Sequence, residues 1–334
     1  AMASAGVWKT RNNGTTWQHV FRNEGAYATG VVAIDPHSPD TVWVGSGENN
    51  SQRSVGYGDG VYRSTDGGAT WKNMGLKNSG HISMIRFHPT ERGTLWVAAQ
   101  GPLWSDGGDR GLYKTTDGGE TWERIFEIDP HTGANEFVVN PADPDVIVAS
   151  SYQRRRHVWT LINGGPGSGI HKSSDGGKTW RKLTGGLPSG ELGRIGLADA
   201  PAAPGMIYAT IEGGGGDCEI YRTSNFGESW EKRASGAPGC SQYYSELVVD
   251  PNNPDRLYAL STFTHLSEDG GQSWERISFK YRHVDDHALW IDPANSDHFW
   301  IGGDGGVYET WYNGGSWRHI TNLQTVQYYR ATPD

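Results

Sequence analysis

The stretch "VYRSTDGGATW" at residues 61–71 decides the fold, because its second part recurs along the chain. The recurring pattern is [ST]-x-[DN]-x-G-x-[TS]-W, and seven copies begin 43 to 58 residues apart. Repeats with a period of about 40 to 50 residues are typical of propellers and solenoids, so we interpret the motif as architecture and not as a catalytic loop. The copies are "TRNNGTTW" (10–17), "STDGGATW" (64–71), "TTDGGETW" (115–122), "SSDGGKTW" (173–180), "TSNFGESW" (223–230), "SEDGGQSW" (267–274) and the degraded "TWYNGGSW" (310–317).

Each motif joins two short alternating runs, such as "GVYRS" and "TWKNM", and therefore reads as the turn of a hairpin. Its hydroxyl and carboxylate groups suit hydrogen bonds to turn amides, its glycine accepts positive φ, and its Trp suits the sheet edge. Two more strands precede most copies, as in "SELVVDPNNPDRLYALS" (245–261). The unit is then four strands, A to D. The sequence predicts an all-β chain: a single seven-bladed β-propeller of four-stranded antiparallel blades over residues 1–334.

The two ends do not complete this ring by themselves. Residues 1–24 provide only strands C and D of the first blade, and "QTVQYYRATPD" (324–334) reads as a strand A with nothing after it. Either this last strand closes the first blade, or the chain is a fragment of a longer protein with further domains.

Composition excludes several classes of protein. The 334 residues carry a formal net charge of −9, which argues against a nucleic-acid partner. The 48 Gly and 15 Trp, without long apolar runs, suit short strands and argue against membrane insertion. No phosphate-binding loop, zinc-protease motif or serine-hydrolase elbow occurs, so we expect no cofactor. Cys218 and Cys240 are the two cysteines, and they fall in loops of one unit on the same face, so we expect a disulfide.

The repeated motif resembles the Asp-box, or bacterial neuraminidase repeat, of sialidases, xyloglucanase-like glycosidases and sortilin receptors. The resemblance extends to "GENNSQRSVGYGDGVYRSTDGG", "AQGPLWSDGGDRGLYKTTDGG", "YQRRRHVWTLINGG" and "HVDDHALWIDP", which look like large exported bacterial sortilin-like proteins often named glycosyl hydrolases. It implies Asp-box turns in the propeller and an extracytoplasmic location, either periplasmic, cell-surface or secreted. The resemblance does not imply any particular reaction.

Because strands alternate in direction, B–C and D–A loops share one face, here called the loop face, and the A–B and motif turns share the opposite turn face. Individual loops on a rigid scaffold usually carry function. In "YQRRRHVW" an arginine cluster beside aromatic residues suits an anion, or else forms salt bridges between blades. The predicted ligand-binding residues are Glu48, Asn50, Arg53, Asp109, Arg110, Arg154, Arg155, Arg156, His157, Trp159, Tyr243, Tyr244, Asp286 and His287.

Two further readings concern carboxylates. In "RHVDDHALW", His283, Asp285 and His287 are weak metal candidates, and the alternative is a hydrogen-bonded network. A glycosidase needs two carboxylates across the sugar. Inner-strand acids also serve structural roles, so no pair is singled out. The catalytic candidates are Glu136, Glu246, Asp285 and Asp286, with Glu48, Asp109 and Glu212 on the same face.

We therefore predict an exported propeller that binds a peptide or glycan through the loop face, and the alternative is a glycoside hydrolase that uses a pair of these carboxylates. Replacing Asp66 or Trp71 in the motif should damage folding. Replacing Arg155 by Ala or Asp286 by Asn should weaken binding and leave stability nearly intact.

Overall fold

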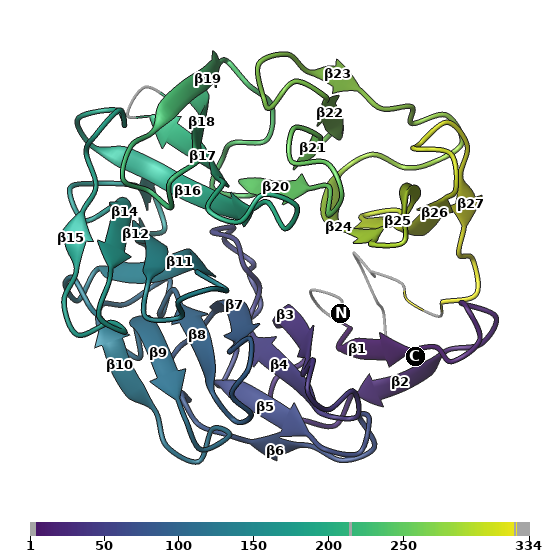
Figure 1. The fold of residues 1–334 in the computed structure, drawn as a ribbon. Coiled ribbons are helices and arrows are strands. Elements are labelled where there is room, and N and C mark those ends of the chain that lie inside the picture. The colour runs from purple at the N-terminus through teal and green to yellow at the C-terminus, as the bar shows by residue number, and fades with distance from the viewer. Residues whose placement is uncertain (1–4, 214–215, 324, 326–334) are drawn as a thin grey trace.

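A computed structural model describes residues 5–213, 216–323 and 325, and arranges their strands as antiparallel sheets around a common centre (Figure 1). Six sheets have at least four strands and are called blades 1 to 6 in chain order. In each blade the first strand lies nearest the centre of the ring and the last lies at the rim. A two-stranded N-terminal hairpin lies between blade 6 and blade 1. The fold is thus an all-β propeller with four-stranded antiparallel blades.

The strands have the following bounds. The N-terminal hairpin is β1 (Val7–Lys9) and β2 (Gln18–Phe21). Blades 1 and 2 are β3 (Thr29–Ile34), β4 (Val42–Ser46), β5 (Val61–Ser64), β6 (Lys72–Asn73), and β7 (Ile82–Phe87), β8 (Leu95–Ala99), β9 (Gly111–Thr115), β10 (Glu123–Phe126). Blades 3 and 4 are β11 (Thr132–Val139), β12 (Ile147–Arg156), β13 (Leu161–Asn163), β14 (Gly169–Ser173), β15 (Arg181–Lys182), and β16 (Leu192–Asp199), β17 (Ile207–Gly213), β18 (Cys218–Thr223), β19 (Glu231–Ser235). Blades 5 and 6 are β20 (Glu246–Val249), β21 (Leu257–Leu260), β22 (His265–Ser267), β23 (Glu275–Arg276), and β24 (Asp286–Asp292), β25 (Asn295–Gly303), β26 (Gly306–Thr310), β27 (Arg318–His319).

The hydrophobic core is a series of layers between neighbouring blades. One layer packs Val148 and Ile170 of blade 3 against Leu197, Ile207 and Ile211 of blade 4, all of them buried. The second strand of each blade is apolar enough to be covered on both faces by neighbouring blades. In β8 ("LWVAA") and β21 ("LYAL") every residue is buried. Hydrophobic packing between neighbouring blades therefore stabilises the ring.

The repeated motif forms the turn between the third and fourth strands, as predicted from its chemistry. In the copy at 64–71, the Ser64 hydroxyl donates to Asp66 (2.7 Å) and accepts the N–H of Gly68 (2.8 Å), and Asp66 in turn accepts the N–H of Thr70 (2.9 Å). Gly67 and Gly68 have φ of +67° and +93°, which glycine adopts without steric cost. Hydrogen bonds also hold the pKa of Asp66 well below its usual range, that from the Thr70 hydroxyl first.

The motif tryptophans have a second role that the pattern alone does not reveal. The indole N–H of Trp71 donates to Val20 O (2.6 Å), that of Trp122 to Met74 O (2.8 Å), and that of Trp180 to Ile125 O (2.7 Å). Each acceptor lies in or next to the outermost strand of the preceding sheet. The motif therefore ties neighbouring blades together as well as closing its own hairpin.

Replacing Trp122 by Phe is expected to lower the free energy of unfolding by about 1 to 3 kcal/mol more than the same change at Trp274. Trp122 donates a hydrogen bond to Met74, whereas the buried indole nitrogen of Trp274 has no hydrogen-bond partner in the described part of the chain. Both variants lose the same indole volume, so the difference isolates the bond between blades. Urea unfolding of the two variants measures it, and equal losses would contradict the assigned role.

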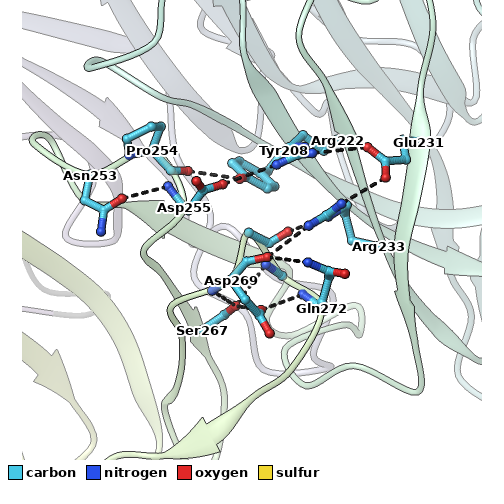
Figure 2. Close-up of polar contacts among 12 residues, drawn as sticks. Tyr208, Arg222, Glu231, Arg233, Asn253, Pro254, Asp255, Ser267, Asp269 and Gln272 are labelled. Carbon is cyan, nitrogen blue, oxygen red and sulfur yellow. Dashed lines mark hydrogen bonds and ion pairs between the residues drawn. The ribbon is translucent and has the colours of Figure 1, made fainter.

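Polar side chains reinforce the turn face between blades 4 and 5 (Figure 2). Arg222 pairs with Glu231 of its own blade and Asp255 of the next, both at 3.2 Å. Arg233 donates to the backbone oxygens of Asp269 and Gly270, both at 2.9 Å. Arg233 of blade 4 thus holds the motif turn of blade 5, and Arg222 holds the turn between β20 and β21.

The expected number of blades is wrong for the described residues, which form six blades and the two-stranded hairpin β1–β2. The hairpin supplies only the strands that residues 1–24 encode, and the strand A expected within 324–334 lies outside the described residues, apart from Thr325. Asn322 connects blade 6 to the hairpin, since its amide donates to the backbone oxygens of Gly14 and Thr15, both at 2.9 Å.

Two further features bear on the expectations from sequence. Cys218 and Cys240 form a disulfide with a Cα–Cα distance of 5.3 Å, which joins β18 to the loop before β20. Among the described residues, no helix is long and apolar enough to cross a membrane.

Candidate functional site

A long loop between β4 and β5, residues 47–60, runs across the centre of the ring toward β16 and β20 (Figure 1). We call it the central loop. Its far contacts are with blades 2 to 5: Ser51 N–H donates to the Gln242 side chain (3.0 Å), and Glu48 O lies 2.8 Å from His81 Nδ1. Ser51 is completely buried. The central loop therefore connects opposite sides of the ring on the loop face.

Buried arginines hold the central loop by its backbone. Arg154 Nη1 donates to Asn50 O (2.8 Å) and to the Ser51 hydroxyl (3.1 Å), and Arg194 Nη1 donates to Asn49 O (3.1 Å). Arg156 Nε donates to Ser51 O (3.2 Å). The predicted arginine cluster therefore does not converge on one surface point, because neighbouring residues of β12 point to opposite sides of the strand.

Arg155 points the other way and lines an open pocket with a volume of about 200 Å³, which we call the hairpin pocket. Asp106 accepts hydrogen bonds from Arg155 and, on the same oxygen, from His131 Nδ1 (2.9 Å). Burial works against ionisation of Asp106, but the hydrogen bond with His131 and the charge of Arg155 outweigh it and lower the pKa of this carboxyl. The pocket is lined by Asp106, His131, Gln153, Arg154, Arg155, His157 and Ile162.

An exposed aromatic residue stands at the tip of the hairpin formed by β12 and β13. Trp159 is 79% exposed, and its ring stacks on that of His157 with centroids 5.3 Å apart. Val158 and Ile162 of the same hairpin are also exposed. The pairing of Arg156 with Leu161 leaves only four residues for the turn, which presents the indole outward. The pocket and the indole together offer a cleft with charged side chains in its lining beside an exposed apolar ring.

A second group of rings lies where β20 and β24 begin, and we call it the ring cluster. Tyr244 stacks on His287 with centroids 5.4 Å apart, and Tyr243 meets His287 edge-on at 5.0 Å. The Tyr244 hydroxyl donates to Asp285 Oδ1 (2.6 Å), and burial together with this bond raises the pKa of Tyr244 to about 12. Asp285 has a φ of +65°, a costly conformation for a residue other than glycine.

The structure separates the residues proposed from "RHVDDHALW". Asp286 is buried, pairs with Arg282 (2.7 Å) and accepts the hydroxyl of Thr264 (2.6 Å). We therefore leave it out of the binding site and correct our expectation that its replacement spares stability. Asp285 bonds to Tyr244, and His287 lies 3.3 Å from Asp304. In the described part of the chain no group of three metal-binding side chains is assembled, His283 included.

The structure does bring Glu136 and Glu246 into electrostatic contact. They occupy equivalent places in β11 and β20, and β16 lies between those two strands in the ring. Burial raises the pKa of Glu136 to about 7, and Arg194 partly offsets the rise. Burial and the charge of Glu136 raise the pKa of Glu246 to about 7. The two surroundings differ, because the surface of Glu246 is exposed, so burial accounts for the raised pKa more securely at Glu136. Glu136 is buried and accepts the N–H of Leu197 (2.6 Å).

The other predicted residues have varied surroundings. Arg110 is buried and donates to Gln100 O and Ser105 O (both 2.7 Å), so its role is in the loop itself. Asp109 accepts the N–H of Asn78 (2.9 Å), and Glu48 accepts the amide of Asn50 (3.2 Å). Arg53 is exposed.

Sequence reasoning missed several residues of these clusters. Asp106 and His131, with Gln153 and Ile162, complete the hairpin pocket. Asp304 faces His287, and the charge of Arg194 acts on both glutamates. Apart from Gln153 and Ile162, each comes from a different blade or loop than its partners, and the linear pattern carries no sign of such a meeting.

Comparisons with known proteins support the fold and the resemblance. The chain matches the profile described as "Sortilin, neurotensin receptor 3" of the sortilin-Vps10 family over residues 5–159. A xyloglucanase of Acetivibrio thermocellus is 28% identical over 210 residues, which cover 53% of this chain and 22% of the relative. A Paenibacillus xyloglucanase is 25% identical over 283 residues, covering 74% and 26%. The resemblance to sortilin-like propellers named as glycosidases is confirmed.

A solved structure agrees on the fold. The crystal structure of a xyloglucanase from Xanthomonas campestris superimposes with a TM-score of 0.65 and 16% identity, covering 93% of this chain and 49% of that chain. The alignments with the two curated xyloglucanases span about a quarter of those proteins, 22% and 26%.

Proposed function

We propose that this protein is an exported Asp-box propeller that binds a glycan through the hairpin pocket on its loop face. The observation that carries the proposal is the open pocket of about 200 Å³ beside Trp159, an indole that is 79% exposed. Sugar rings pair apolar faces with hydroxyl groups, which suits an aromatic platform next to carboxylate, imidazole and guanidinium side chains. The similarity to xyloglucanases favours a glycan over a peptide.

Replacing Trp159 by Ala is expected to weaken glycan binding about 10- to 30-fold, because a central exposed aromatic commonly contributes about 1.4 to 2 kcal/mol to such contacts. The probes are xyloglucan, a mixed-linkage glucan, a xylan and polygalacturonate in native affinity gels, followed by calorimetry with oligosaccharides of any polymer that retards the protein. Stability should change little, since the indole is exposed.

Tyr312→Ala is the matched control, because this tyrosine is 72% exposed but belongs to a motif turn on the opposite face. Tyr243→Ala tests the ring cluster. Loss of binding in Tyr243→Ala but not in Trp159→Ala would move the site to the ring cluster. If only peptides from a random library bind, the glycan proposal is wrong.

Glycoside hydrolysis is a second candidate function, and the raised pKa values of Glu136 and Glu246 favour it, since a general acid must hold its proton near neutral pH. The near-complete burial of Glu136 and the course of the central loop count against it. Release of reducing sugar from a bound polymer, abolished in Glu246→Gln, would establish this function.

A further inference from the structure

The hairpin pocket carries an excess of positive charge, although the protein has a formal net charge of −9. Two arginines, two histidines and one carboxylate line it. The single carboxylate, Asp106, is already shared by Arg155 and His131. Among the described lining residues, one carboxylate therefore faces two guanidinium groups.

The buried arginine in the pocket wall has no compensating charge among its strongest neighbours. Arg154 is 1% exposed, and its guanidinium donates to backbone oxygens and a hydroxyl. The fully charged groups that act most on it are Arg194 and Arg110, both positive, and burial together with these charges lowers the pKa of Arg154 to about 9. Its Nε has no hydrogen-bond partner in the structure described. Like charges enclosed in protein are weakly screened, so they raise the potential at the pocket.

We infer that the ligand of the hairpin pocket is an acidic glycan, in which a sugar carboxylate faces Arg155. This inference rests on the proposed function and narrows its substrate class. Arg155 presents a forked donor that suits a carboxylate, and its side chain remains partly exposed beside Asp106. The neighbouring Asp129 does not line the pocket, and its carboxylate accepts the backbone N–H of His131 (2.7 Å).

The test compares an oligogalacturonate of four to six sugars with its methyl ester, which has the same sugars without the charge. The charged form is expected to bind at least about tenfold more tightly at 50 mM salt, and the ratio should shrink at 500 mM as screening increases. Arg155→Met should remove the preference. The control is Arg181→Met, which changes an exposed arginine paired with Glu228 on the turn face.

Asp106→Asn provides the sharper variant, because it removes the one carboxylate that the described residues contribute to the lining. It should strengthen binding of the charged oligosaccharide about threefold or more. Damage to the fold would weaken binding instead, so the sign of the change separates the two effects. Equal binding of the charged form and its ester would overturn this inference and leave the proposed function standing. No binding of any glycan would overturn both.

Discussion

Asp286→Ala is expected to lower the free energy of unfolding by about 3 to 5 kcal/mol, because it leaves the guanidinium of Arg282 buried without its counter-charge. The two side chains are 2% and 1% exposed, and the ion pair spans 2.7 Å. Asp286 also accepts the hydroxyl of Thr264, which connects the first strand of blade 6 to blade 5. Urea unfolding followed by tryptophan fluorescence measures the loss, since Trp317 lies 4.6 Å from the Arg282 guanidinium.

The control is Asp304→Asn, which changes an exposed carboxylate of the same blade and should alter stability by less than about 0.5 kcal/mol. The double variant Arg282→Met with Asp286→Leu removes both charges and should recover most of the lost stability. If the single and double variants are equally unstable, the loss comes from packing and not from an unpaired charge.

This ion pair also shows where sequence reasoning stops. The motif turn could be predicted because Ser64, Asp66 and Gly68 lie within five residues, so their hydrogen bonds are local. Asp286 and its neighbour Asp285 have the same chemistry in the sequence, but one is buried in an ion pair and the other bonds to Tyr244 near the surface. Asp286 is the first residue of β24, whereas Asp285 lies just before the strand with a φ of +65°, and the sequence does not say where the strand begins or which carboxylate will be buried.

The candidate site shows the same limit on a larger scale. Arg155, His157 and Trp159 could be proposed from one contiguous stretch, and all three remain in the proposal. Asp106 and His131 belong to loops 25 residues apart that meet only when blades 2 and 3 pack, so no local pattern indicates them. Arg154 also lines the pocket, but its guanidinium is buried and donates to Asn50 O and the Ser51 hydroxyl of the central loop. Residue type alone does not distinguish an arginine that binds a ligand from one that holds a loop by hydrogen bonds to its backbone.

The carboxyl of Glu136 is expected to make the protein less stable as the pH rises from about 4.5 to about 7. Its pKa is raised from 4.5 to about 7 in the folded state, mainly by burial. A raised pKa means that the folded state prefers the protonated carboxyl, so this contribution to stability is fully present below pH 4.5 and is lost as the pH passes through 7. The shift corresponds to about 3 kcal/mol.

Glu136→Gln keeps an oxygen for the N–H of Leu197 but removes the charge. The free energy of unfolding of the variant should therefore rise relative to that of the wild type as the pH rises. At pH 8 the variant should be more stable by about 1 to 3 kcal/mol. Burial lowers the pKa of His81 to about 3 and that of His171 to about 4. These two imidazoles therefore make the protein more stable as the pH rises over part of this range, which opposes the effect of Glu136. For this reason the quantity to measure is the difference in unfolding free energy between Glu136→Gln and the wild type. Urea unfolding at pH 4.5, 6, 7 and 8 gives the difference. Glu191→Gln, at an exposed position, should run parallel to the wild type. If the difference in unfolding free energy between Glu136→Gln and the wild type is the same at every pH, Glu136 does not titrate in this range. That result would also remove the main support for a proton donor in the centre of the ring.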